Sequence, residues 1–241
     1  MKRDKYDYSD YGAFKQAASQ PMGSRFYQFA RMIGLKNRYL RFLRIADRNK
    51  PVLEIGCGNG KFLQEMLDAG FTSVRGIELS PTYQPVVDSA LIVQGAAVPY
   101  LESCVRESIG TIVALDVFEH IPATELHTMM HLIYERLMPG GIVVFRVPNM
   151  ASPVALINYF GDLSHVTPLN EGSIRHLIFD SGLTMCGLYP EPFAYPRSLS
   201  TIAGIFLWPI YKFLTDSAMA AFGIHAKVLT PNLVCVLSKL E

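Results

Sequence analysis

Apolar residues follow two alternating patterns along the chain from Pro51 onward. Short, nearly continuous apolar runs indicate buried strands, and stretches in which apolar residues return every three or four positions indicate helices. The predicted strands cover residues 51–55, 73–78, 91–94, 110–115, 142–147, 183–188 and 233–237, and the predicted helices cover 61–69, 123–137 and 171–181. This alternation predicts an α/β fold: a doubly wound, mostly parallel seven-stranded sheet with helices on both faces.

Two regions depart from the alternation. Residues 1–50 contain a polar, tyrosine-rich arm, followed by an apolar periodicity at about 24–49 that predicts a cap helix. Residues 192–231 connect the last two strands, and a connection of this length predicts a helical apolar insertion. We therefore expect a single domain over 1–241, with residues 51–191 as its binding core.

The segment 199–214 of this insertion is apolar on more than one helical face. It is shorter than the roughly 20 residues that span a bilayer, and Pro209 interrupts it. Three interpretations are open: packing within the protein or against a second copy in a homodimer, a lid over an apolar ligand, or contact with a membrane surface.

Charge and cysteine content bear on which partners the protein can bind and on its cellular compartment. Lys and Arg number 22 and Asp and Glu 21, so a net charge of +1 provides no general attraction for nucleic acid. The four cysteines have no CxxC spacing, and the N-terminus has no apolar secretory core. We therefore expect a cytoplasmic protein with reduced thiols, and the sequence contains no recognisable metal-ligand pattern.

The stretch VLEIGCGNGKFL, residues 52–63, places Gly56, Gly58 and Gly60 directly after the first predicted strand. In a doubly wound sheet this turn brings the backbone closest to the ligand, and glycine permits positive φ and close approach. The spacing is GxGxG, and Lys61 stands where a dinucleotide-binding GxGxxG has its third glycine. The match to a dinucleotide site is therefore imperfect.

Two acids define the ligand more closely. Glu54 lies two residues before the loop, where its charge repels a pyrophosphate and attracts an ammonium or sulfonium. Glu78 ends the second predicted strand, at the place where a carboxylate accepts hydrogen bonds from a ribose diol. Together they predict a site for a nucleoside with a positively charged tail.

With these residues the chain resembles the class I S-adenosylmethionine-dependent methyltransferases over about 51–188. LEIGCGNG resembles their first motif, GIELSP (76–81) their second, TIVALDVFEHIP (111–122) their fourth-strand motif, and LMPGGIVVFRVPN (137–149) the fifth-strand region. The resemblance implies a Rossmann-like methyltransferase sheet, with residues 51–191 as a cofactor-binding core and S-adenosyl-L-methionine as cofactor. The implied cofactor-binding residues are Glu54, Gly56, Cys57, Gly58, Gly60, Glu78, Leu79, Ala96, Ala97, Leu115 and Asp116.

Within this resemblance, the backbone at Gly56 and Gly58 would contact the methionine part of the cofactor, and Leu115 and Asp116 would lie near its amino group. The chain departs from the family at the third strand. Many members carry an Asp that binds the adenine amino group where this chain has Ala96, so backbone groups near Ala96 and Ala97 would have to serve.

A narrower resemblance covers residues 160–183 and 228–240, which look like a bacterial group of methyltransferases associated with cell-surface polysaccharide and lipid biosynthesis. It implies a setting more than a substrate. We expect O-methylation of a hydroxyl on a small-molecule, glycan-linked or lipid-linked acceptor. Transfer to a hydroxyl requires a base, and histidine suits this role. The candidates are His165, oriented by Asp162, and His120 after the fourth predicted strand.

Two other functions remain open. An N-methyltransferase acting on a small amine would rely on Asp116 and Glu119 to position the amine. A non-catalytic protein would keep the fold as an interaction module, with segment 199–214 as its partner surface.

Overall fold

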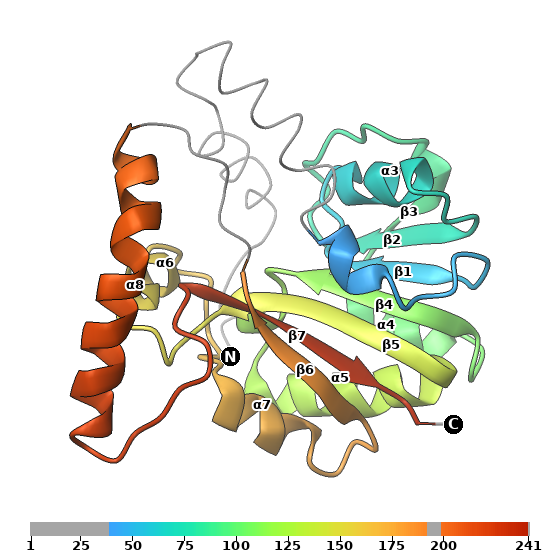
Figure 1. Ribbon diagram of the computed structural model, residues 1–241. Helices are drawn as coiled ribbons and strands as arrows, with labels where there is room; N and C mark the ends of the chain where they lie inside the picture. The colour runs from blue at the N-terminus through green and yellow to red at the C-terminus, as the bar shows by residue number, and fades with distance from the viewer. Residues whose placement is uncertain (1–38, 192–198, 241) are drawn as a thin grey trace, which may run out of the picture.

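The computed structural model describes residues 39–191 and 199–240. A seven-stranded sheet in the order β3-β2-β1-β4-β5-β7-β6 forms the centre of the molecule (Figure 1). Its strands are β1 (Val52–Ile55), β2 (Val74–Glu78), β3 (Ile92–Gln94), β4 (Ile109–Leu115), β5 (Leu137–Pro148), β6 (Thr184–Pro190) and β7 (Asn232–Ser238). Strands β1 to β5 pair in parallel, and β7 runs antiparallel between β5 and β6. The predicted mostly parallel, doubly wound sheet is confirmed.

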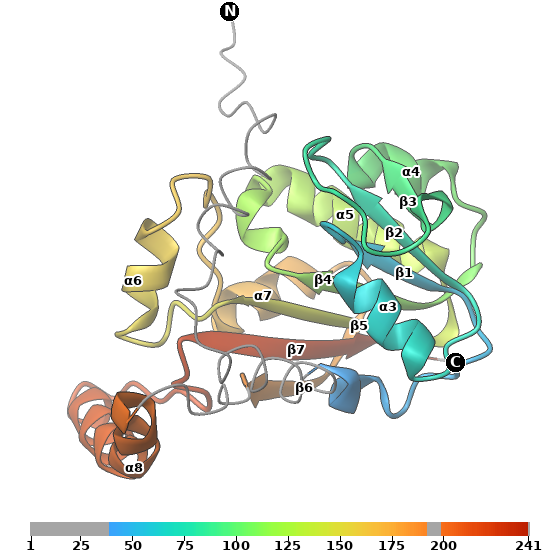
Figure 2. The same ribbon diagram turned by 90° about the horizontal axis from the view of Figure 1, so that it is seen from above.

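Helices cover the two faces of the sheet, as expected. Figure 2 shows α4 (Ala97–Ser103), α5 (Ala123–Arg136) and α7 (Glu171–Ile178) on one side of the sheet, and α3 (Lys61–Asp68) with the 3-10 helix η2 (Leu40–Leu43) on the other. Two apolar clusters match this division: Phe118, Leu126 and Ile133 belong to the first, and Phe62 and Met66 to the second. The strands therefore bury apolar residues on both faces, which explains their nearly continuous apolar runs.

The structure corrects several predicted elements. The cap helix does not extend to Asn49, because η2 ends at Leu43 and the backbone N–H of Asn49 donates to Asp47 Oδ1 at 3.0 Å in a local turn. The part of that prediction over 24–38 lies outside the described residues. Two short helices, α4 and α6 (Ala155–Phe160), form where the sequence pattern gave no helix. Seven residues or fewer are too few to display a helical period.

The predicted helical insertion contains α8 (Leu199–Ala220), with Pro209 inside the helix. Both views place α8 at one side of the molecule, beyond α6 from the sheet (Figures 1 and 2). Its apolar side chains Phe206, Ile210 and Phe213 are exposed, so burial of these side chains within the protein is not observed among the described residues. Contacts with a second copy or a membrane surface stay predictions. No helix in the described ranges is both long and apolar enough to cross a membrane.

Candidate active site at the carboxyl ends of the strands

A cleft of about 1380 Å³ opens at the carboxyl ends of β1, β2 and β4. Its lining joins the glycine loop, the end of β2, the start of α4, the end of β4 and the segment before α7. Open parallel sheets bind ligands at this edge, where the crossover helices diverge. The predicted residues that line the cleft are Gly56, Gly58, Glu78, Leu79, Ala96, Ala97, Leu115, Asp116 and His120.

The glycine loop has the backbone that its sequence predicts. Gly56, Gly58 and Gly60 adopt φ values of +70°, +55° and +78°, in the left-handed region that other residues occupy at a cost. A Cβ at Gly56 would lie 2.5 Å from Val117 Cγ2. The loop can therefore present bare backbone to a ligand only with glycine at these positions. Gly60 itself lies behind the lining, where it precedes α3.

Glu78 fastens the glycine loop to the end of β2. Its Oε2 accepts a hydrogen bond from Gly58 N at 2.8 Å, and its Oε1 accepts one from Ser80 N at 2.7 Å. Burial raises the pKa of the Glu78 carboxyl, and these backbone N–H groups oppose the rise by stabilising the charged form. Each oxygen retains acceptor capacity for a hydroxyl, so the position suits the predicted ribose contact.

Glu54 and Cys57 support the loop from beneath and do not line the cleft. Burial, together with the charges of Glu65 and Glu78, raises the pKa of Glu54 well above its usual range, and Glu54 Oε2 has no hydrogen-bond partner among the described residues. Burial likewise raises the pKa of the Cys57 thiol, which keeps it uncharged. Burial therefore suppresses the negative charge that the sequence assigned to Glu54, which lies behind the loop.

We expect Glu54→Gln to stabilise the protein at alkaline pH. Because the folded state holds this proton more tightly than the unfolded chain, stability falls as the pH rises from about 4.3, the unfolded pKa, to the raised folded pKa. The variant lacks this loss, so at pH 8 its free energy of unfolding should exceed the wild-type value by at least about 1 kcal/mol. Urea unfolding across the pH range measures the difference.

The exposed Glu102→Gln is the matched control, and its unfolding curve should follow the wild type at every pH. A Glu54→Gln variant that is no more stable than wild type at pH 8 would show that Glu54 is not the source of the pH dependence.

The wall at β3 and α4 lacks the family's adenine-binding Asp. Ala96 is the N-cap of α4 and makes no side-chain cap, so the first-turn N–H groups of Ala97 and Val98 are the polar groups that this backbone offers. Gln94 donates through Nε2 to the carbonyls of Glu78 and Leu79 at 2.9 and 2.6 Å. It therefore fixes the spacing of β2 and β3 where the nucleoside is expected.

The end of β4 carries a strained residue. Asp116 has a φ of +58°, one of two positive values among the described residues other than glycine, and its side chain forms an ion pair with Arg146. A positive φ in a residue with a Cβ costs on the order of 1 kcal/mol, and such strain concentrates at functional sites. No local pattern indicates this pair, because Arg146 lies 30 residues away on β5.

The structure separates the two candidate histidines. His120 is half-buried and lines the cleft, and its Nδ1 lies 2.9 Å from Ser164 Oγ. Ser164 Oγ donates to Asp162 Oδ1 at 2.5 Å, so it can accept from the His120 Nδ1–H, which leaves the lone pair on Nε2. Asp162 therefore orients His120 through Ser164.

His165 lies behind this pair and does not line the cleft. Its side chain is 6 % exposed, and Nδ1 donates to the Tyr159 carbonyl at 2.8 Å. Its Nε2 is 3.9 Å from an oxygen of Asp162, beyond hydrogen-bond distance, and its ring packs 4.7 Å from that of His120. The geometry favours His120 over the expected His165 as the group that meets an acceptor.

Ligand atoms of Glu119, His120 and His165 lie within 4.8 Å of one another, a grouping that can hold a metal ion. The sequence pattern gave no sign of it, because Glu119 and His120 are adjacent while His165 lies on a separate loop. The loop that carries His165 contacts the 3-10 helix η4 (Phe118–His120). Its backbone N–H groups at Val166 and Thr167 both donate to the Glu119 carbonyl.

Sequence reasoning also missed Tyr83. It lines the cleft, and its ring would lie 3.6 Å from a Cβ at Gly58. Burial and the charge of Glu78 raise the pKa of Tyr83 to about 12, so its hydroxyl stays a hydrogen-bond donor at neutral pH. An aromatic residue in a loop without a periodic pattern gives no signal from which this placement can be read.

Comparisons with known proteins agree on the family. Residues 26–186 match the family model described as Methyltransferase domain. Ubiquinone biosynthesis O-methyltransferases from Pseudomonas entomophila (strain L48) and Cupriavidus pinatubonensis (strain JMP 134 / LMG 1197) are 26% and 33% identical to the chain over 125 and 107 residues. The matches cover 49% and 42% of this chain and 53% and 42% of those proteins, so the chain spans about half the length of these relatives or less. They do not support the expected polysaccharide setting.

Solved structures show the same fold. A S-adenosylmethionine-dependent methyltransferase from Archaeoglobus fulgidus superposes with a TM-score of 0.61 at 16% identity, covering 90% of this chain and 100% of that one. Phosphoethanolamine N-methyltransferase 2 from Haemonchus contortus, in complex with S-adenosyl-L-methionine, gives 0.57 at 15% identity, with 86% and 52% covered. With the matched segment spanning more than half of its length, the chain belongs to the methyltransferase domain family, and its fold is that of S-adenosylmethionine-dependent methyltransferases of known structure.

Proposed function

We propose that this protein transfers the methyl group of S-adenosylmethionine to a hydroxyl of a small or lipid-linked acceptor, with His120 as the base. The observation that carries the proposal is the series His120, Ser164 and Asp162, which ends in a histidine Nε2 on a cleft-lining side chain. The acceptor oxygen attacks the methyl carbon, the carbon–sulfur bond breaks with its electron pair going to sulfur, and His120 Nε2 accepts the hydroxyl proton.

The cleft offers room for an acceptor beside the cofactor. Beyond His120 its lining continues along α5 and α7, with Leu126, Met129 and Leu177 as apolar walls and His127 and His176 as polar groups. The curated relatives from Pseudomonas entomophila and Cupriavidus pinatubonensis are named ubiquinone biosynthesis O-methyltransferases, which favours an oxygen acceptor of apolar character. None of the lining belongs to α8, so we do not assign α8 the role of a lid.

Two observations weigh against methylation of an amine. Asp116 is occupied by its ion pair with Arg146, and Glu119 is 1 % exposed and does not line the cleft. Asp116 lines the cleft with its carboxylate already engaged by Arg146, and Glu119 does not line it, whereas His120 lines the cleft as an oriented base. A non-catalytic role would not explain why Ser164 and Asp162 orient His120 at the cleft.

The test is an acceptor panel with radiolabelled S-adenosylmethionine, in which hydroxylated aromatic compounds, with and without an apolar tail, are compared with matched amines. We expect label in the hydroxyl compounds, and stronger turnover of those with the apolar tail. Turnover confined to amines would overturn the assignment to oxygen. Absence of S-adenosylmethionine binding in calorimetry would overturn both enzymatic functions in favour of an interaction module.

A further inference from the structure

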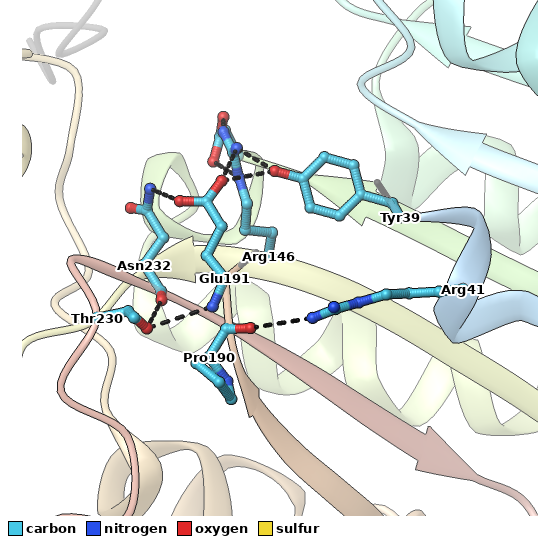
Figure 3. Close-up of polar contacts among 8 residues, drawn as sticks. Tyr39, Arg41, Arg146, Pro190, Glu191, Thr230 and Asn232 are labelled. Carbon is cyan, nitrogen blue, oxygen red and sulfur yellow. Dashed lines mark hydrogen bonds and ion pairs between the residues drawn. The ribbon is translucent and has the colours of Figure 1, made fainter. Parts of the chain in front are cut away.

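Arg146 lies at the carboxyl end of β5, in register with Leu115 of β4, and its guanidinium joins three side chains from distant parts of the chain (Figure 3). Nε donates to Asp116 Oδ1 at 2.6 Å, and Nη2 forms an ion pair with the other oxygen of Asp116. Nη1 donates to Tyr39 Oη at 2.5 Å and to Glu191 Oε1 at 2.8 Å. The guanidinium is therefore held on one side by Asp116, which lines the cleft, and on the other by Tyr39 and Glu191, which do not.

Tyr39 and Glu191 are themselves held by further hydrogen bonds. Tyr39 Oη donates to Glu191 Oε1 at 2.7 Å, and Asn232 Nδ2 donates to Glu191 Oε2 at 2.7 Å. The backbone N–H of Glu191 donates to Thr230 Oγ1 at 3.2 Å (Figure 3). Tyr39 precedes η2, Glu191 follows β6 and Asn232 begins β7. Residues from three separate parts of the chain thus orient the planar guanidinium of Arg146 toward Asp116.

Asp116 needs this support. Its backbone has a φ of +58°, and its N–H donates to the Arg146 carbonyl at 3.1 Å, so Arg146 holds both the main chain and the side chain of Asp116. Asp116 lines the cleft together with Gly56 and Val117. A change in its conformation would shift this wall of the cleft, where we expect the methionine part of the cofactor to bind.

We propose that Arg146 is a positioning residue for S-adenosylmethionine, which holds Asp116 in its strained cleft-facing conformation and is itself aligned by Tyr39 and Glu191. Among the described residues this group joins one guanidinium to two carboxylates, and the excess of carboxylate favours a cationic ligand at this wall. The contacts described above join Tyr39 and Glu191 to the cleft-lining Asp116 through Arg146, so Arg146 is the route by which we expect them to affect the cofactor.

The first experiment measures S-adenosylhomocysteine binding by calorimetry for Arg146→Met and Arg146→Lys. We expect the Kd to rise at least about tenfold for Arg146→Met, and less for Arg146→Lys, which keeps the charge but loses the two-pronged contact. Turnover at saturating S-adenosylmethionine should change less than KM, because the reacting groups are unaltered. Arg106→Met, which removes an exposed ion pair with Glu135, is the matched control and should bind like wild type.

The second experiment uses Glu191→Gln and Tyr39→Phe, which leave every cleft-lining residue in place. We expect each to raise the Kd for S-adenosylhomocysteine by about threefold or more, with little further loss when combined with Arg146→Met, since coupled residues act through one element. A lower Tm with an unchanged Kd in these variants would show a purely structural role and overturn the proposal, as would wild-type binding by Arg146→Met. These outcomes concern cofactor binding alone, so they are separate from the outcome of the acceptor panel.

Discussion

Replacing His120 with alanine should lower kcat for a hydroxyl acceptor by about 10²- to 10⁴-fold, the range in which a positioned general base contributes. S-adenosylhomocysteine should still bind, because the cofactor contacts that we predict at the glycine loop and Glu78 do not involve His120. The wild-type rate should fall as the medium is acidified, since a protonated imidazole cannot accept the hydroxyl proton, and His120→Ala should lose this acid limb. Single-turnover methyl transfer across the pH range measures both effects.

Two further histidine variants make this prediction specific. His131→Ala changes an exposed residue paired with Asp180 and should retain wild-type turnover. His165→Asn retains a donor for the Tyr159 carbonyl and should cost less than about tenfold, because His165 supports His120 by packing. If His165→Asn is inactive while His120→Ala is not, the base is His165. Loss of wild-type turnover on chelation of divalent cations would instead assign the Glu119, His120 and His165 group to a metal.

Glu78→Gln should weaken S-adenosylhomocysteine binding by about 100-fold. Both carboxylate oxygens accept backbone N–H groups, from Gly58 and Ser80, and a glutamine must present an NH₂ to one of these donors. A hydrogen bond to a charged group contributes about 1.5–3 kcal/mol, which corresponds to one to two factors of ten in affinity. The variant also removes one carboxylate acceptor for the ribose hydroxyls.

Calorimetry tests this change against Glu125→Gln, which alters an exposed acid that lines the same cleft and should bind within about twofold of wild type. Glu78→Asp separates the effect of charge from that of side-chain length, because it keeps the carboxylate but shortens the side chain. Its loss of S-adenosylhomocysteine affinity should be intermediate. A Glu78→Gln protein that binds within about threefold of wild type would mean that Glu78 neither anchors the loop nor contacts the cofactor.

The sequence predicted the strands well because buried parallel strands need apolar residues on both faces, and that need leaves a continuous run such as Val52–Ile55. It predicted the glycine loop because positive φ restricts the choice of residue at Gly56, Gly58 and Gly60. It failed at α4 and α6, which are too short for a period, and at residues 44–49, where local turns end the helical pattern.

By itself, therefore, the sequence determined the sheet and the position of the glycine loop after β1, since each depends on residue type at fixed local spacing. Only the tertiary structure decided which histidine faces the cleft, because His120 and His165 both follow strands, and the contact between the 162–167 loop and η4 selects one of them. It alone joined Arg146 to Asp116, Tyr39 and Glu191, which are up to 107 residues from Arg146 in sequence. Contacts between distant residues depend on how the strands are ordered in space, and no local pattern records that order.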